Sequence, residues 1–273
     1  MASDLTQTEV VPSTPSSPEP PRSSGSLAGP HRRRFVLIYG GLAAALVAAL
    51  VVLVVFAGRS INPPPAWSAW KPSGGGQGAA KQIAAHVSQG YLLPDGNQLV
   101  DVFAKPPSVS PAANQTVPIR YVVVKGPGGG NKEQAEVTTT NSVQYSLCGL
   151  GAACAIGSGK PSVERGTLVR REILELALYT FKYVKGIEHV IAFMPPVPGQ
   201  QPKYVVYLRA SDLAQKLKLP LDTTLAKKVP LPKAIPAREV RTIDATTEPR
   251  VFTFGLLQTQ TGDAVFVFTP LPA

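Results

Sequence analysis

Residues 162–185 read SVERGTLVRREILELALYTFKYVK, and this stretch decides the fold class. Ser162 can cap the start of a helix, Glu164 falls in its first turn, and Gly186 follows as the expected stop. Apolar side chains recur every three or four residues, and the stripe we expect to be buried consists of Val169, Ile173, Leu176, Ala177, Phe181 and Val184. The opposite face, which we expect to be solvated, carries Arg171, Glu175, Tyr179 and Lys182. The pattern predicts one long amphipathic helix.

Segments typical of β-strands lie on both sides of this helix. They alternate apolar and polar residues or are rich in β-branched residues, and they span residues 97–105, 117–125, 135–147, 189–195, 203–209, 250–258 and 264–271. Shorter helices are predicted at 79–93 and 211–218, and a Pro-rich crossing over 219–236 leads to the last hairpin. Because strands and helices do not alternate regularly, a parallel doubly wound sheet is not expected. The sequence predicts an α+β domain with a mainly antiparallel sheet over residues 77–273.

A separate apolar run, FVLIYGGLAAALVAALVVLVVFAG, occupies residues 35–58 and contains no charged side chain. As a helix rising about 1.5 Å per residue it spans roughly 36 Å, which exceeds the roughly 30 Å hydrocarbon core of a bilayer. A cleaved signal peptide is the alternative, although the apolar region of a signal has only about 7 to 15 residues. No Cys follows the run closely to accept a lipid. We therefore expect a single-pass transmembrane helix.

The charges that flank this helix predict its orientation. Three arginines, 32–34, precede it, whereas only Arg59 and Lys71 follow it closely. Because basic residues near a span are retained on the cytoplasmic side, we expect the N-terminus in the cytoplasm and the C-terminal domain outside the cell membrane.

Residues 1–34 are rich in Ser, Thr and Pro and lack periodic apolar positions, which predicts a disordered cytoplasmic tail. Thr6 and Thr8 lie beside Glu9, a pattern that resembles substrates of bacterial Ser/Thr kinases. A solvated spacer without a phosphorylation site is the alternative.

Residues 59–76 form a Pro-rich and then Gly-rich stretch that predicts a stalk between the membrane and the domain. Trp67 and Trp70 fall within it. These rings either lie at the outer membrane interface, which aromatic side chains favour, or pack against the domain.

The charge of the chain indicates its partners. The chain has 27 Lys plus Arg against 17 Asp plus Glu, and residues 59–273 alone have 23 against 14. Such a surface favours anionic partners, and an exported domain rarely meets nucleic acid. We expect the membrane itself, an envelope protein, or an anionic envelope polymer or lipid, and no nucleic acid.

Cys148 and Cys154 bracket the short segment CGLGAAC, in which glycines permit a tight turn. In an exported domain two such thiols are expected to form a disulfide. A redox-active pair is the alternative, but the Cys-x-x-Cys spacing is missing from the sequence.

Known catalytic and cofactor motifs are not recognisable in the sequence. The stretch GSGK at 157–160 fails the phosphate-loop pattern, and the Ser-x-x-Lys match at 68–71 has no Lys-Thr-Gly partner. His86 and His189 are the only histidines after the apolar run, and two Cys and three His in all nearly exclude a metal centre built from them. We predict no catalytic residue, no metal and no cofactor.

One group of basic residues remains as a candidate for binding an anion or a partner. Lys160, Arg165, Arg170 and Arg171 lie at the start of the long helix, whose positive N-terminal end adds to the attraction. A solvated helix face with Arg stems packed on apolar surface is the alternative.

Residues 147–196, LCGLGAACAIGSGKPSVERGTLVRREILELALYTFKYVKGIEHVIAFMPP, carry a resemblance. A Cys-bracketed loop followed by an Arg-Arg-Glu helix is similar to that of a family of uncharacterised single-pass membrane proteins of high-GC Gram-positive bacteria, of actinobacterial type. The resemblance covers about a fifth of the chain. It implies a place at the bacterial cell envelope and implies no activity.

Together these observations favour a membrane-anchored extracytoplasmic domain that acts as a non-enzymatic binding or scaffolding module at the cell envelope. The alternative is an envelope enzyme, a hydrolase or transferase, whose site uses common carboxylate, Ser or Tyr side chains that a single sequence does not reveal. Whether the protein is an enzyme is left open by the sequence, with the balance toward binding.

Overall fold

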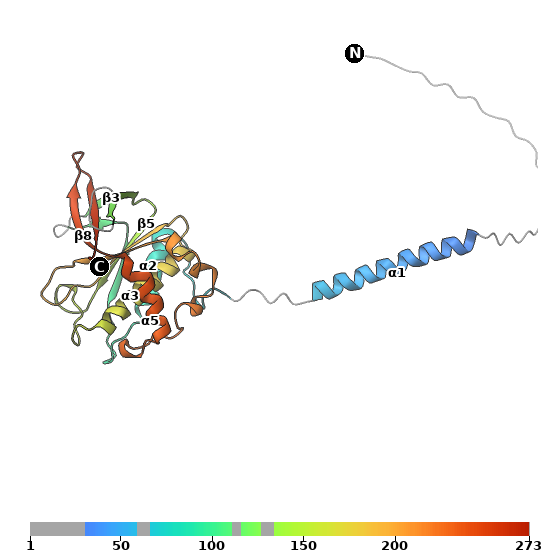
Figure 1. Ribbon diagram of the computed structural model, residues 1–273, viewed down its shortest axis with the longest axis horizontal. Coiled ribbons are helices and arrows are strands. Elements are labelled where there is room, and N and C mark those ends of the chain that lie inside the picture. The colour runs from blue at the N-terminus through green and yellow to red at the C-terminus, as the bar shows by residue number, and fades with distance from the viewer. Residues whose placement is uncertain (1–30, 59–65, 111–115, 127–133, 273) are drawn as a thin grey trace, which may run out of the picture. The chain divides into compact units, whose positions relative to one another are not determined.

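The computed structural model describes residues 31–58, 66–110, 116–126 and 134–272. The chain divides into two compact units, Met1–Asn62 and Pro63–Ala273, and each is described by itself (Figure 1). Residues 1–30 of the expected cytoplasmic tail, with Thr6 and Thr8, and residues 59–65 of the expected stalk lie outside the described residues. Residues 31–34, which we expected in the disordered tail, form the first turn of a helix.

The first unit contributes one helix, α1 (His31–Gly58). Its segment Phe35–Val55 has a mean hydropathy of 2.6, and none of that segment is buried. Among the described residues this is the one helix long and apolar enough to cross a membrane, and a signal sequence has the same character.

The second unit is built on one mixed sheet. Its strands are β1 (Asp101–Lys105), β2 (Ser108–Val109), β3 (Val117–Lys125), β4 (Gln134–Thr138), β5 (Ser142–Cys148), β6 (His189–Phe193), β7 (Tyr204–Arg209), β8 (Val251–Gln258) and β9 (Ala264–Pro270). The strand order is β1-β5-β6-β7-β8-β9-β3-β2, with β4 also paired to β3. The β5–β6 and β3–β9 pairs are parallel and the other pairs are antiparallel, so the predicted α+β class is confirmed. The stretch 135–147 forms two strands that pair with β3 and with β1 and β6 rather than with each other.

The sheet is nearly closed. Its two end strands, β1 and β2, follow each other directly in the chain through Pro106 and Pro107. The backbone N–H of Ser108 in β2 donates to Oε1 of Gln144 in β5 at 2.9 Å, so a side chain links one end of the strand order to the strand next to the other end. Apolar residues cover both faces of this curled sheet.

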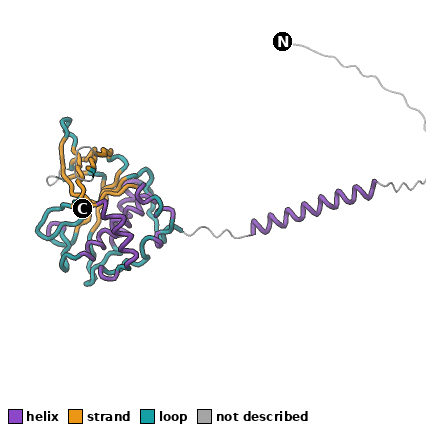
Figure 2. The backbone as a smooth tube through the Cα atoms, viewed as in Figure 1, coloured by secondary structure: helices purple, strands orange, loops and turns teal. Residues whose placement is uncertain are grey.

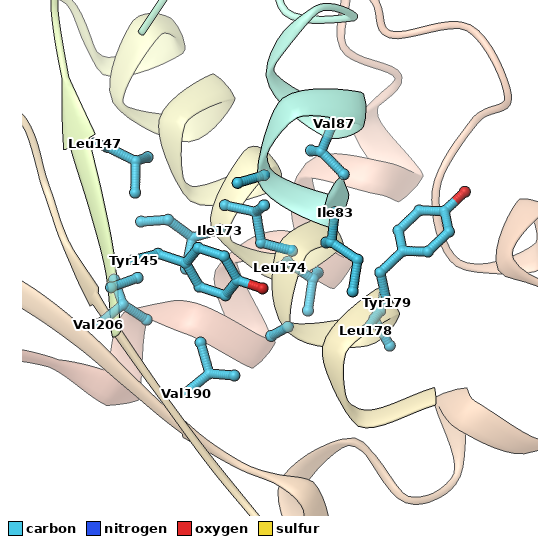
Figure 3. Packing of buried hydrophobic residues seen from close by; sticks show 14 of the residues in the cluster. Ile83, Val87, Tyr145, Leu147, Ile173, Leu174, Leu178, Tyr179, Val190 and Val206 are labelled. Carbon is cyan, nitrogen blue, oxygen red and sulfur yellow. The ribbon is translucent and has the colours of Figure 1, made fainter. Parts of the chain in front are cut away.

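The helices of the domain gather on one side of the strands, as Figure 2 shows. They are α2 (Gly76–Ser88), α3 (Val163–Tyr183), α4 (Ala210–Leu213) and α5 (Ala237–Thr247). Figure 3 shows how α2 and α3 pack on β5, β6 and β7 through the side chains of Ile83, Val87, Ile173, Leu174, Leu178, Tyr145, Leu147, Val190 and Val206. The predicted helix at 162–185 is confirmed as α3, and the Ser162 hydroxyl accepts from the Arg165 N–H at its start.

A second apolar core lies on the other face of the sheet. It contains Ile119, Val122, Ile191, Val205, Tyr207, Phe252, Phe266 and Phe268. Along β6, Val190 and Ala192 face the helices while Ile191 faces this second core, as the two-residue period of a strand requires. Strands β6 and β7 are therefore buried on both faces.

The face of α3 that we expected to be solvated is mostly buried. Arg171 and Tyr179 are 0% and 4% exposed, and the Glu175 side chain is 15% exposed, which leaves Lys182 as the exposed member. The expectation is wrong because the crossing over 219–236 and helix α5 cover Arg171, while Trp67 and Trp70 cover Tyr179. The Arg171 side chain contacts the crossing and α5 through the carbonyl of Ala226 and the carboxylate of Glu239.

Helix α5 was not expected from the sequence. Pro236 precedes it, Glu239 lies in its first turn, and Ile243 is its one fully buried aliphatic side chain. Because Thr246 and Thr247 supply much of its remaining buried surface, the apolar period that marks a helix is weak in the sequence.

The two tryptophans of the expected stalk pack on the domain. The Trp67 ring lies edge-on to Tyr179 and Tyr183, with centroids 5.5 and 5.6 Å away, and Trp70 stacks on His86 at 3.9 Å. The second of the two alternatives for these rings is therefore the observed one, and the folded domain already includes the chain from Ala66 onward.

Candidate functional site

The four basic residues predicted as a binding cluster do not share one surface. Lys160 is exposed in the loop before α3. Arg165 is 7% exposed and its Nη1 donates to the carbonyl of Ser158 at 2.8 Å. Arg170 is held by two carboxylates, Asp244 at 2.8 Å and Glu248 at 3.2 Å.

Arg171 is fully buried and belongs to an ionic network inside the domain. Its Nε donates to Glu239 at 2.6 Å, its Nη1 to Glu175 at 3.0 Å and to the Tyr91 hydroxyl at 2.5 Å, and its Nη2 to the Ala226 carbonyl at 2.8 Å. Burial lowers the pKa of Arg171, but the neighbouring Tyr91, Glu175 and Glu239 raise it further, so the net pKa lies above its ordinary value. This guanidinium is not accessible to an external ligand, and it fastens α5 to α3.

The neighbour of Arg171 on the helix, Glu172, has a different environment. It is 0% exposed, and neither carboxylate oxygen has a hydrogen-bond partner among the described residues. Burial raises the pKa of Glu172 well above its ordinary value, and the nearby Glu175 raises it further while Arg171 lowers it. Burial without a hydrogen-bond partner therefore favours the neutral form of this carboxyl group.

A polar pocket lies where β7 ends and β8 begins, which we call the β7–β8 pocket. It has a volume of about 250 Å³ and is lined by Val124, Tyr207, Arg209, Asp212, Pro249, Arg250 and Phe252. Tyr207 and Phe252 belong to the second core, so the floor of the pocket is apolar and aromatic. Arg209 is the last residue of β7, Asp212 lies in α4, and Arg250 directly precedes β8.

Asp212 holds the two arginines of the pocket in place. Its carboxylate accepts from Nη2 of Arg209 at 3.1 Å and from Nε of Arg250 at 3.0 Å. Although burial raises the pKa of Asp212, the hydrogen bonds from Arg250 and Arg209 lower it to about 2, so the carboxylate is ionised at neutral pH. Two guanidinium groups against one carboxylate leave the lining with a net positive charge.

Tyr207 of the pocket lining contacts a histidine, His189. The Tyr207 hydroxyl and Nδ1 of His189 are 2.8 Å apart, and the two rings stack with centroids 5.7 Å apart. Burial raises the pKa of Tyr207 to about 12, so its hydroxyl remains protonated and can donate to the imidazole. Burial also lowers the pKa of His189, which favours the neutral ring.

The sequence did not single out this pocket. Arg209, Asp212 and Arg250 come from three segments, and only the three-residue spacing of Arg209 and Asp212 gave any local signal. In the described part of the chain, no group of three His, Cys, Asp or Glu side chains is placed to hold a metal ion.

The predicted disulfide between Cys148 and Cys154 is confirmed, with their Cα atoms 4.4 Å apart. The glycines between them are required by close backbone approach, because a Cβ on Gly149 would lie 2.3 Å from the carbonyl oxygen of Ala155. A disulfide is consistent with a domain outside the cytoplasm.

Comparison of this chain with models of protein families, with characterised proteins and with solved structures gives no match.

Proposed function

We propose that this protein is a membrane-tethered module of the bacterial cell envelope, whose extracytoplasmic domain binds an anionic group in the β7–β8 pocket. In this proposal α1 is a single-pass anchor with the N-terminus in the cytoplasm. The uncharged span Phe35–Val55, the three arginines at 32–34 and the Cys148–Cys154 disulfide support it.

The arrangement of Arg209, Asp212 and Arg250 carries the proposal. Hydrogen bonds to Asp212 use Nε and Nη2 of Arg209 and Nε of Arg250, while Nη1 of Arg250 donates to the Thr246 carbonyl. Each guanidinium has five N–H donors, so both arginines keep donors for another oxygen anion. Planar guanidinium groups match carboxylate and phosphate geometry, and the aromatic floor favours a ligand with an apolar part beside its charge.

The protonation states of the lining favour binding over catalysis. With its pKa near 2, Asp212 does not take up a proton at neutral pH, and with its pKa near 12, the Tyr207 hydroxyl does not lose one. A general acid or base works best when its pKa lies near the ambient pH.

A titration with small anions tests this site. The full-length protein in detergent is titrated with acetate and with inorganic phosphate, and the NMR signals of the Arg209 and Arg250 Nε–H groups are followed. We expect Arg209→Gln and Arg250→Gln each to weaken binding about tenfold or more, since a hydrogen bond to a charged group contributes about 1.5–3 kcal/mol. Arg241→Gln removes an equal charge from an exposed position of α5 and should leave binding unchanged. Saturable binding that neither pocket variant weakens would overturn the assignment.

The His189–Tyr207 pair supports the second candidate function, an envelope hydrolase or transferase, because a neutral imidazole is available as a base. Under that alternative the purified protein turns over an activated ester, and His189→Gln removes the turnover while anion binding persists. A protein that binds anions without such turnover is the module proposed above.

A further inference from the structure

Five lysines lie on the chain segments that meet where the chain enters the domain, and we call them the lysine collar: Lys71, Lys182, Lys185, Lys216 and Lys218. Nζ of Lys182 donates to the carbonyl of Leu217 at 3.1 Å and lies 5.5 Å from the centroid of the Trp67 ring. The backbone N–H of Leu221 donates to the Trp67 carbonyl at 2.7 Å. These contacts place the entering chain, the end of α3 and the segment after α4 together.

The positions of the other two members of the collar, Lys71 and Lys185, follow from those of their neighbours in the chain. Lys71 comes directly after Trp70, whose ring is 5.6 Å from Tyr179, one turn before Lys182 on α3. Lys185 lies two residues beyond the end of α3. The collar therefore lies on segments next to the C-terminal end of α3, whose dipole favours positive charge.

Acidic residues do not neutralise the collar. Among the described residues, none of the five lysines forms an ion pair with a carboxylate. Of the nearest acids in the chain, Asp222 pairs with Lys227 at 3.3 Å and Glu188 accepts from the Asn141 amide at 2.7 Å. The side chain of Leu219 beside the collar is apolar and 54% exposed, which suits a surface that meets a lipid interface.

The covalent link to α1 limits how far the collar lies from the membrane. Seven residues, 59–65, separate Gly58 from Ala66. Even a fully extended chain of that length reaches only about 25 Å. A tether this short gives the headgroups a high effective concentration at the collar.

We propose that the lysine collar binds the anionic phospholipid headgroups of the membrane that holds α1. The inference rests on the proposed anchoring function of α1. Each Lys near an anionic surface increases partitioning about fivefold, so five together orient the domain with its entry side toward the bilayer.

The two tryptophans report on this contact. Trp67 and Trp70 are the only tryptophans of the chain, and both lie at the collar. The full-length protein is reconstituted into vesicles of phosphatidylcholine, with or without phosphatidylglycerol, that carry a little headgroup-spin-labelled lipid as a fluorescence quencher. We expect stronger quenching in the anionic vesicles. The difference should disappear at about 1 M salt, where the Debye length is about 3 Å.

Matched variants distinguish the effect of the collar lysines from the effect of the overall charge of the protein. Lys185, Lys216 and Lys218 are changed together to Gln, which should strongly reduce the lipid-dependent difference, and together to Arg, which should keep it. The control changes three exposed lysines elsewhere, Lys160, Lys203 and Lys233, to Gln and should behave as the unmodified protein. Equal quenching in neutral and anionic vesicles, or an equal loss in both Gln variants, overturns the proposal.

An alkaline wash of the same vesicles tests the anchor separately. A protein that resists the wash but shows no lipid-dependent quenching keeps α1 as an anchor and overturns the collar. A protein that the wash releases overturns the anchor, and its binding to added anionic vesicles then measures the collar alone.

Discussion

At the scale of single residues, the domain buries charged side chains, which are rarely fully buried in proteins. Arg171 is fully buried, and Glu239, Glu175 and Tyr91 accept or share its hydrogen bonds. A buried ion pair is weak evidence of net stability, because desolvation offsets the attraction between the charges. The clearer role of the network is geometric: it specifies how α5 and the 219–236 crossing seat on α3.

Glu172 provides the first test, because it lies beside this network without a hydrogen-bond partner among the described residues. Burial, and then Glu175, raises its pKa above the ordinary value of 4.5. The unfolded chain releases this proton as the pH rises through 4.5, whereas the folded chain keeps it to a higher pH. The contribution of Glu172 to stability is therefore fully present below pH 4.5 and is lost as the pH rises from there through the raised pKa of the folded state. Glu172→Gln should therefore gain unfolding free energy relative to the unmodified protein as the pH rises.

Urea unfolding followed by circular dichroism, below and above pH 4.5, measures this gain. Glu188→Gln changes an exposed carboxylate and should alter the unfolding free energy by less than about 0.5 kcal/mol at either pH. A constant difference between Glu172→Gln and the unmodified protein across the pH range would show that folding does not raise the pKa of Glu172.

At the scale of elements, the sequence correctly predicted the helices and strands that depend on residues close together in the chain. The Ser162 cap, the period of α3 and the strands of both hairpins were found because each signal lies within one stretch of sequence. The prediction that this face of α3 is solvated was wrong because the residues that bind Arg171 there, Ala226 and Glu239, lie more than fifty residues away in the chain. The β7–β8 pocket was missed for the same reason, since pairing of β7 with β8 brings Arg250 to Asp212.

Two glycines, one in the disulfide loop and one in α3, test how the local backbone geometry affects stability. Gly166 lies inside α3 with nothing within 4 Å of an added Cβ, so Gly166→Ala should stabilise the domain by about 0.5–1 kcal/mol through helix propensity. Gly149→Ala should destabilise it, because the added Cβ would lie 2.3 Å from the backbone of Ala155 in the disulfide loop. Thermal unfolding of both variants gives the comparison. A raised midpoint for Gly149→Ala would contradict the close approach at Gly149, and a lowered midpoint for Gly166→Ala would contradict the gain from helix propensity.

At the scale of the whole molecule, the question is which side of the membrane the domain occupies. A domain outside the cytoplasm is consistent with the Cys148–Cys154 disulfide, and three arginines at 32–34 precede the uncharged span Phe35–Val55. The excess of positive charge N-terminal to the span predicts that the N-terminus remains in the cytoplasm. We therefore expect an epitope at the N-terminus to be protected from protease added to intact cells that lack an outer barrier, while the C-terminal domain is digested.

Arginine substitutions supply the control for this orientation. Changing all three arginines at 32–34 to Gln removes the charge difference across the span, so part of the population should insert the other way, with the N-terminal epitope digested and the domain protected. Domains that face the cytoplasm should also lack the Cys148–Cys154 disulfide, which alkylation of free thiols detects. If instead the N-terminal epitope is lost from cells while the domain appears in the medium, α1 is a cleaved signal sequence, and the lysine collar then has no anchored bilayer beside it.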